Sequence, residues 1–211
     1  MIACTIAGSD SGGGAGIQAD LKTFQELKVF GTSVITALTA QNTKGVHGVY
    51  PVEASFVEAQ LTAVLDDFDV KAMKTGMLFD ATIIHAVACI LKDKRIPLVV
   101  DPVMIAKGGQ SLLLDEAVEA FKSDLLYLAT VCTPNIPEVE VLTGISIQTQ
   151  EEIEKAANIL LSYGVKCVVI KGGHLQGELA TDAIYIQGEA PFYVETARFK
   201  TPHTHGTGCT F

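Results

Sequence analysis

The sequence predicts an α/β fold in which a mainly parallel sheet is covered by helices on both faces. Short apolar runs rich in β-branched residues alternate along the chain with segments of helical period. Such alternation is typical of parallel strands joined by right-handed helical crossovers. In addition, the glycines and polar residues that could bind a ligand come directly after the apolar runs, where ligand sites of such sheets lie.

The predicted strands are continuous apolar runs, which is typical of strands buried on both faces. They cover residues 2–7, 33–40, 70–74, 98–101, 129–133 and 165–171. Residues 182–187 and 192–196 predict a hairpin that turns at Gly188-Glu189, so an antiparallel pair joins the sheet last. We find no internal repeat, linker or low-complexity stretch, and we expect residues 1–211 to form one domain.

Three predicted helices place apolar residues on one face, and they cover residues 54–68, 80–92 and 150–163. Their ends carry the expected capping signals. Asp80 precedes the second helix, and Thr149 with Glu152 forms a capping box before the third. Gly164 is placed to end that third helix.

The chain has 211 residues, of which 48% are hydrophobic, and its mean hydropathy is +0.34. These values are high for a soluble protein, but the apolar runs are too short to span a bilayer. The first residues carry no basic leader. We therefore expect neither a signal peptide nor a membrane segment, and we place the protein in the cytoplasm.

The five cysteines are widely spaced and form no C-x-x-C pair, which argues against a disulfide framework or a zinc site. We expect Cys4, Cys89, Cys132 and Cys167 to pack in the core, whereas Cys209 stands among glycines and polar residues. A net charge of -9 argues against a nucleic-acid partner. We expect a small-molecule partner whose phosphates are held by local amides, a few cations and a metal.

The run His205-Gly206-Thr207-Gly208-Cys209 combines small residues with a thiol. Glycines allow successive amides to turn inward as a nest, and a helix that starts there would add positive potential, so the run fits a phosphate. An ordinary glycine-rich turn fits the same residues. Because the sequence stops at Phe211, we expect that the helix carrying these amides is missing and that the C-terminal part of the fold is truncated.

Two common nucleotide-binding motifs are excluded or disfavoured. A Walker A loop is absent, because Lys171 precedes its glycines instead of following them. Residues 14–19 satisfy G-x-G-x-x-A, but the second strand ends in Gln41-Asn42 without an acid for ribose hydroxyls, which argues against a Rossmann oxidoreductase. The candidates that remain all come after strands, so one edge of the sheet collects residues 8–10, 41–42, 75–77, Asp101, Asn135, Glu138 and Lys171.

Seven segments in this order resemble the hydroxymethylpyrimidine and hydroxymethylpyrimidine-phosphate kinases of thiamine biosynthesis, within the ribokinase-like superfamily. They are residues 5–24, 33–46, 74–78 (KTGML), 101–104 (DPVM), 133–138 (TPNIPE), 171–174 (KGGH) and 205–210 (HGTGCT). The resemblance covers the whole chain. It implies a ribokinase-like three-layer αβα sandwich, a homodimer, and transfer of two phosphoryl groups in turn from ATP, with Mg²⁺, to one pyrimidine substrate.

The resemblance also implies a substrate site. Gln41 has one acceptor and two donors in its amide, so it can pair with the ring nitrogen and the exocyclic amine of an aminopyrimidine together. Alternatively, this amide forms hydrogen bonds with a loop at the strand end. By resemblance, Met77 and Val103 wall the pyrimidine ring, although ordinary core packing fits them as well. The other residues assigned to substrate are Gly8, Asp10 and Ala15.

For the nucleotide and the metal, Asn135 and Glu138 match the N-x-x-E element of the superfamily. By resemblance, Glu138 holds Mg²⁺ largely through water, with Asp101 adding charge to the same water shell. A helix N-cap followed by an acid in the first turn fits the same two residues, and both roles are compatible. By resemblance, Lys171, Asn135 and Thr207 contact ATP, Lys171 as a point charge on its phosphates.

For catalysis, the amides of Gly206, Thr207, Gly208 and Cys209 would neutralise charge on the transferred phosphoryl group. Cys209 stands where many superfamily relatives carry an aspartate base, and a helix N-terminus beside a cation would lower the pKa of its thiol. No histidine is assigned as a catalyst, and those flanking the phosphate elements, His174 and His205, fit hydrogen-bonding spacers. Residues 106–111 resemble a substrate-covering flap, and an ordinary loop fits them equally.

Two other functions stay open at this point. Pyridoxal kinase, in the same superfamily, shares the GTGC-like ending, and the A-Q-N-T sequence at 40–43 separates the chain from it. A non-catalytic pyrimidine-binding protein is the second, because the cradle helix and part of the adenine pocket would be missing if the chain truly ended at Phe211.

Overall fold

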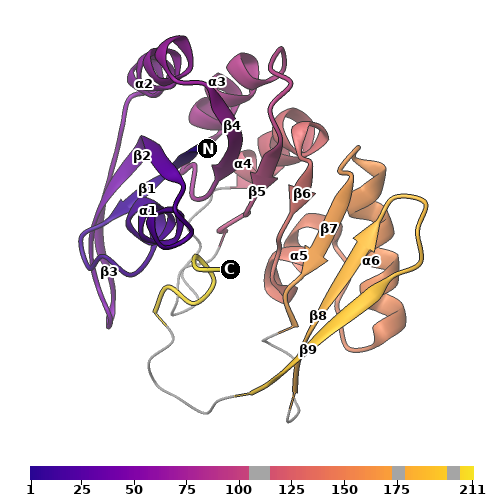
Figure 1. Cartoon of the computed structure of the whole chain (residues 1–211). Helices are drawn as coiled ribbons and strands as arrows, with labels where there is room; N and C mark the ends of the chain where they lie inside the picture. Colours follow the sequence, from indigo (N-terminus) through magenta and orange to yellow (C-terminus); the bar gives the residue numbers. More distant parts are fainter. Residues whose placement is uncertain (105–114, 173–178, 199–204) are drawn as a thin grey trace.

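The computed structural model describes residues 1–104, 115–172, 179–198 and 205–211. Within these ranges nine strands form one sheet in the order β3-β2-β1-β4-β5-β6-β7-β8-β9 (Figure 1). The strands from β2 to β7 in this order are parallel, and β3, β8 and β9 are antiparallel. Their bounds are β1 Ile2–Asp10, β2 Phe30–Asn42, β3 Gly45–Pro51, β4 Val70–Thr75, β5 Leu98–Val100, β6 Val131–Cys132, β7 Cys167–Ile170, β8 Leu179–Ile186 and β9 Phe192–Ala197.

Helices cover both faces of this sheet, as predicted. They are α1 Gly16–Glu26, α2 Ala54–Asp67, α3 Ala81–Leu91, α4 Asp115–Ala120, α5 Ile136–Thr143 and α6 Gln150–Ser162, with short helical turns η1 Phe121–Leu125 and η2 Leu126–Leu128. The chain moves from β1 outward to β2 and then back across β1 to β4. Because crossovers are right-handed, this reversal puts α1 on one face and the later helices on the other (Figure 1).

The predicted capping signals are confirmed. The carboxylate of Asp80 accepts a 2.9 Å hydrogen bond from the amide of Ile83 at the start of α3. Thr149 and Glu152 form the capping box of α6. Gly164, with φ of +101°, lies just after the end of that helix in a conformation that favours glycine.

Two elements of the N-terminal half are missing from the predicted set. β3 is an exposed edge strand that contains two glycines and a proline, so it lacks the apolar pattern of a buried strand. α1 begins at a glycine and buries Asp20 beside Ile17 and Ala19, so its buried face is partly polar. The helical segment at 115–128 is also absent from the predictions, and the predicted 129–133 strand shortens to β6.

Four cysteines were predicted to pack in the core, and the structure confirms this for two of them. Cys4 and Cys132 are fully buried, whereas Cys89 and Cys167 are only partly buried. Cys89 lies at the rim of α3, where its Sγ is 3.4 Å from Nε2 of His85. In the part of the chain that the structure describes, no helix is both long and apolar enough to cross a membrane.

A buried ion pair ties α1 to the sheet beside β1 and β4. Nζ of Lys74 lies 2.8 Å from Oδ1 of Asp20, and the side chains of Lys74 and Asp20 are 15% and 4% exposed. The hydroxyl of Thr5 in β1 donates a short hydrogen bond to the same carboxylate. A buried carboxylate with these partners is satisfied, but the lysine depends on it for its counter-charge.

We predict that Asp20→Asn destabilises the protein strongly, because it leaves the Lys74 ammonium buried without a counter-charge. The expected loss in the free energy of unfolding is about 3 kcal/mol. Urea denaturation measures it. The matched control is Asp69→Asn, which removes the partner of Lys71 at 2.6 Å in an exposed pair, with an expected change below about 0.5 kcal/mol. Equal losses in the two variants would contradict the prediction.

Candidate active site

The carboxyl ends of β1 and β4 meet where the strand order reverses, which is the place where open α/β sheets bind ligands. Gly8 and Met77 lie together there, because a Cβ on Gly8 would be 2.5 Å from Cε of Met77. The hydroxyl of Thr36 donates a 2.6 Å hydrogen bond to the carbonyl of Met77 and holds its backbone in place. Two of the residues predicted to contact substrate are therefore neighbours at this edge.

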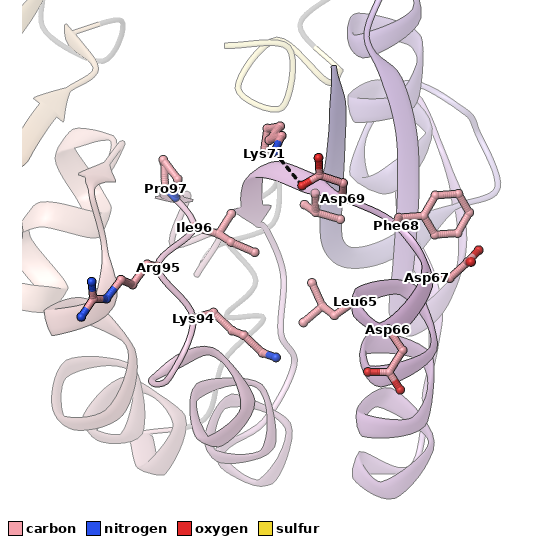
Figure 2. A pocket seen from close by; sticks show the side chains of 11 residues that line it. Leu65, Asp66, Asp67, Phe68, Asp69, Lys71, Lys94, Arg95, Ile96 and Pro97 are labelled. Atoms are coloured by element: carbon pink, nitrogen blue, oxygen red, sulfur yellow. Dashed lines mark hydrogen bonds and ion pairs between the residues drawn. The ribbon is translucent and has the colours of Figure 1, made fainter.

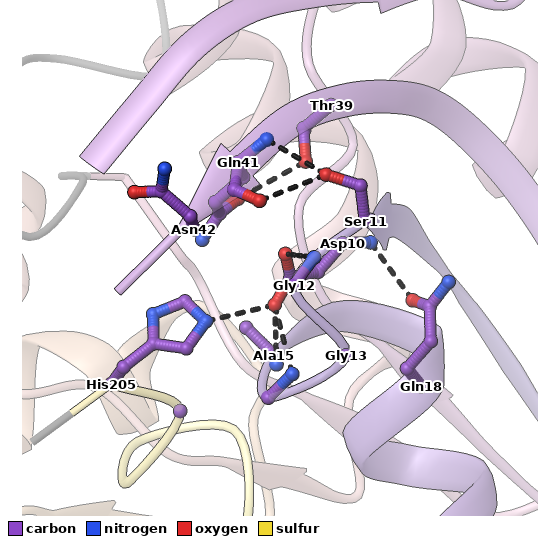
Figure 3. A network of polar contacts seen from close by, with 12 residues as sticks. Asp10, Ser11, Gly12, Gly13, Ala15, Gln18, Thr39, Gln41, Asn42 and His205 are labelled. Atoms are coloured by element: carbon purple, nitrogen blue, oxygen red, sulfur yellow. Dashed lines mark hydrogen bonds and ion pairs between the residues drawn. The ribbon is translucent and has the colours of Figure 1, made fainter. Parts of the chain in front are cut away.

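The loop after β1 is organised by the carboxylate of Asp10. The amides of Gly12, Gly14 and Ala15 donate to it at 2.7, 3.0 and 2.9 Å (Figure 3). Asp10 is only 3% exposed. Burial alone would raise the pKa of this carboxyl, but these amides and the His205 side chain lower it below its ordinary value. Asp10 thus shapes the loop at the N-terminus of α1.

The C-terminal turn docks onto this loop. Nε2 of His205 lies 2.8 Å from Oδ2 of Asp10. Gly206 has φ of +77°, and a Cβ on it would lie 1.7 Å from the carbonyl oxygen of Gly14. The amide of Thr210 donates to the carbonyl of Gly206 at 3.0 Å, which closes one helical turn. The run that contains the predicted anion cradle, 206–209, is therefore held against residues 10–14.

Gln41 lies beside the same loop (Figure 3). The hydroxyl of Ser11 donates to the carbonyl of Gln41 at 2.8 Å and lies 2.9 Å from the Gln41 amide nitrogen, from which it accepts. Thr39 donates to Oε1 of Gln41 at 3.1 Å. Nε2 of Gln41 has no hydrogen-bond partner among the described residues. The side-chain amide of Gln41 thus accepts a hydrogen bond from the Thr39 hydroxyl, and its N–H groups could donate to a ligand.

A second cluster forms at the ends of β5, β6 and β7. Nζ of Lys171 lies 2.9 Å from Oδ1 of Asp101, and the hydroxyl of Thr133 donates to the same oxygen at 3.4 Å. The Lys171 ammonium also lies 5.7 Å from the centre of the Phe211 ring. The chain terminus therefore contacts this cluster as well as the glycine-rich loop.

Asn135 and Glu138 have the capping role that the sequence allowed. The Asn135 side chain accepts from the Glu138 amide at 3.0 Å, and Oε2 of Glu138 accepts from the Asn135 amide at 2.9 Å. Oε1 of Glu138 accepts from the Met104 amide at 3.3 Å. Val103, just before Met104, has φ of +44°, which is strained for a β-branched residue. Glu138 thus holds the backbone next to a strained residue of the predicted substrate wall.

The charges of this cluster are strongly coupled. Burial, together with the Asp101 carboxylate, raises the pKa of Glu138 to about 7. Burial alone would lower the pKa of Lys171, but Asp101 and Glu138 raise it above its ordinary value. Two buried acids therefore share one cation, which leaves an excess of negative charge in the cluster when both carboxyls are ionised.

Cys209 corrects a prediction made from the sequence. We expected a lowered pKa, but burial raises the pKa of this thiol, and the hydrogen bond with the Gly16 amide and the charge of Lys74 offset that effect only in part. Asp101 and Asp20 raise it further. The resting form at neutral pH is therefore the thiol. The sequence does not show this, because it does not reveal how deeply a side chain is buried.

No group of three His, Cys, Asp or Glu side chains in the described ranges is arranged to hold a metal ion directly. The oxygens of Glu138 accept from two amides, and one oxygen of Asp101 pairs with Lys171. This arrangement fits a cation held through water rather than by direct ligation.

His205 has the hydrogen-bonding role expected of a spacer. Lys74 and Asp20 lie in segments that the resemblance covers, but no role was predicted for either of them. A lysine inside an otherwise apolar strand was the signal for the ion pair. The predicted flap at 106–111 and His174 lie outside the described residues.

A surface groove lies at the opposite ends of the strands from the candidate site, around the starts of β4 and β5 (Figure 2). Its lining combines acidic residues from the end of α2 with basic residues that precede β5, namely Asp66, Asp67, Asp69, Lys94 and Arg95. It contains none of the predicted site residues.

We predict that Glu138→Gln makes stability less dependent on pH. With a pKa near 7, raised from 4.5, the stabilising contribution of Glu138 is complete below pH 4.5 and is lost as pH rises through 7. In urea denaturation with EDTA, wild type should therefore lose about 1–3 kcal/mol more than the variant between pH 5 and 8.

The control for this experiment is Glu152→Gln, in the exposed capping box of α6, where hydrogen bonds lower the pKa of the carboxyl. Its pH effect should have the opposite sign. Parallel pH profiles for wild type and Glu138→Gln would show that burial does not raise the pKa of this carboxyl.

Known proteins resemble the chain over nearly its whole length. The hydroxymethylpyrimidine/phosphomethylpyrimidine kinase of Haemophilus influenzae is 56% identical over 211 residues, covering 98% of this chain and 78% of that protein. The enzyme of the same name from Bacillus subtilis is 50% identical, covering 99% and 78%.

Solved structures are also similar to the chain over most of its length. The phosphomethylpyrimidine kinase of Clostridium difficile superposes with a TM-score of 0.84 at 44% identity, covering 93% of this chain and 84% of that one. An ADP complex of Bacillus subtilis pyridoxal kinase superposes with a TM-score of 0.90 at 42% identity, covering 99% and 80%. The family model described as phosphomethylpyrimidine kinase matches residues 10–211. The chain therefore belongs to the phosphomethylpyrimidine kinase family, a family of phosphotransferases with the ribokinase-like fold.

Proposed function

We propose that this kinase transfers a phosphoryl group from ATP to the hydroxymethyl group of 4-amino-5-hydroxymethyl-2-methylpyrimidine, and then a second one to the resulting monophosphate. The observation that carries the proposal is that one loop holds both halves of the site. Ser11 binds the backbone of Gln41, and the Gly16 amide lies close enough to the thiol of Cys209 to lower its pKa. A pyrimidine paired with the Gln41 amide would therefore have the phosphate cradle beside it.

In this proposal the phosphates of ATP lie on the amides of Gly206, Thr207, Gly208 and Cys209. Lys171 supplies a point charge, and Asn135 lies beside it through the bridge between their backbones. Bound Mg²⁺ would neutralise the charge shared among the phosphates and the two carboxylates. Asp101 and Glu138 would hold it through water, because the paired acids leave more negative charge than Lys171 balances.

The first transfer forms a bond between the hydroxymethyl oxygen and the γ-phosphorus, breaks the bond from that phosphorus to the β–γ bridging oxygen, and releases one proton. The thiolate form of Cys209, a minor fraction at neutral pH, accepts that proton from the hydroxyl on its Sγ. In the second transfer the attacking group is already a phosphate anion, so no proton has to move. A thiol that stays neutral does not repel that phosphate, whereas a carboxylate would.

Pyridoxal kinase is the second candidate, and the similarity to the Bacillus subtilis enzyme favours it. Pyridoxal presents a phenolic oxygen and an aldehyde where the aminopyrimidine presents a ring nitrogen and an amine. The Gln41 amide complements the latter pair. We further propose a homodimer in the cytoplasm, and five free cysteines are consistent with a reducing compartment.

We predict that Cys209→Asp spares phosphorylation of the alcohol and selectively slows formation of the diphosphate, by about tenfold or more. A fixed carboxylate replaces a neutral thiol, and each 1.4 kcal/mol of added repulsion is a factor of about ten. Single-turnover assays with the alcohol and with its monophosphate separate the two steps. Equal loss in both steps would discard the role proposed for the thiol.

We predict that Gln41→Leu raises KM for the aminopyrimidine by about 10–100-fold, because it removes two hydrogen bonds to a buried ligand. Coupled ADP-release assays with the aminopyrimidine and with pyridoxal give the comparison. Thr43→Val, at an exposed position nearby, is the control. Faster turnover of pyridoxal by wild type would favour the second candidate, and binding without turnover would favour a non-catalytic pyrimidine-binding protein.

A further inference from the structure

The Asp10–His205 contact joins two segments that are 195 residues apart in the sequence. Asp10 belongs to the loop that positions Gln41 through Ser11, and His205 begins the turn that carries the phosphate cradle. Within the described residues, three hydrogen bonds to the Asp10 carboxylate come from its own loop. His205 supplies a further one from outside the loop (Figure 3).

The contact is buried and closely fitted. The side chains of His205 and Asp10 are 13% and 2% exposed. A Cβ on Gly14 would lie 2.6 Å from Cδ2 of His205, so the imidazole rests directly on the glycine backbone. Both the neutral Nε2–H tautomer and the imidazolium donate to Asp10 in this position. Removing the imidazole would leave one oxygen of a buried carboxylate without this donor.

A second contact holds the other end of the turn. The missing side chain of Gly206 allows the turn to lie against the carbonyl of Gly14, and the Gly16 amide is near enough to the Cys209 thiol to lower its pKa. The charged groups around this region include Asp10, Lys74, Asp20, Asp101 and Lys171. Lys22 also lies there, and its Nζ donates to the carbonyl of Gly13 at 2.6 Å. Residues 10–16 therefore fix the position of the turn from 205 to 209.

We propose that His205 is a positioning residue that latches the phosphate cradle to the substrate loop through Asp10. Ordering either segment then orders the other, so nucleotide and pyrimidine bind with positive coupling. The proposal rests on the proposed function for the identity of the two ligands. The latch itself rests only on the contacts of Asp10, Gly14 and His205.

The first experiment measures the latch without any ligand. Iodoacetamide alkylation of each cysteine is followed by peptide mapping in wild type and in His205→Leu. We expect Cys209 to react at least fivefold faster in the variant, because the turn undocks. Cys4 and Cys132 are fully buried and serve as internal references, so faster reaction of all three thiols would report general unfolding.

Two further variants test whether the change in Cys209 reactivity comes from loss of the hydrogen bond to Asp10. His205→Gln keeps an N–H donor that reaches toward Asp10 and should restore slow alkylation of Cys209. His85→Leu removes an exposed histidine that lies 3.2 Å from Asp124 in a comparable pair, and it should leave Cys209 unchanged. If Cys209 reacts at the wild-type rate in His205→Leu, or if general unfolding explains its reactivity, the latch is disproved.

The second experiment measures coupling by calorimetry, as the affinity of the pyrimidine alcohol with and without a non-hydrolysable ATP analogue. We expect about a fivefold or larger gain in wild type, the lower end for coupled sites. His205→Leu should reduce this ratio toward one, and His205→Gln should restore part of it. An unchanged ratio in His205→Leu would overturn the coupling, whereas absence of pyrimidine binding in wild type would overturn the proposed function and leave the alkylation result standing.

Discussion

The site depends on one buried carboxylate. Asp10 ends β1 at the switch point of the sheet and gathers three amides of its own loop and one imidazole from the other end of the chain. The loop has no strand partner for these amides, so without the carboxylate they would need water. Gly12 and Gly14 allow the backbone to bend around the carboxylate and allow His205 to rest on it. This one hydrogen-bonded centre joins the two segments that carry predicted substrate and phosphate contacts.

Buried ion pairs flank that centre and keep most of its charge balanced. Lys74 is paired with Asp20, and Lys171 is paired with Asp101. Neither lysine is free to receive a phosphate without giving up part of an existing pair, and Lys171 also lies over Phe211. In the proposed site, the attraction for an anionic ligand would therefore come first from backbone amides, which carry no counter-ion. Such a site would allow a chain of net charge -9 to bind phosphates without a basic surface.

The features that topology determines could be predicted from the sequence. Because parallel strands present their carboxyl ends at one edge, residues 8–10, 41–42 and 75–77 were expected to lie together, and Gly8 meets Met77 while Gln41 bonds to Ser11 beside Asp10. The features that packing determines could not be predicted in this way. His205 meets Asp10 across 195 residues, and no local pattern encodes that contact. The thiol pKa of Cys209 was predicted with the wrong sign, because desolvation depends on neighbours that only the fold supplies. β3 was missed because exposed edge strands lack an apolar signal.

The raised pKa values of Glu138 and Cys209 have different consequences for the chemistry. Glu138 is costly to ionise because it is buried and because the Asp101 carboxylate is close, so a cation in the water shell would offset part of that cost. Cys209 is costly to ionise mainly because it is buried, and the same burial makes its thiolate a stronger base once formed. A base that is neutral at rest suits a site that must accept an alcohol first and a phosphate afterwards. In the proposed mechanism, the minor thiolate form takes the proton in the first step, and the predominant neutral thiol does not repel the phosphate in the second.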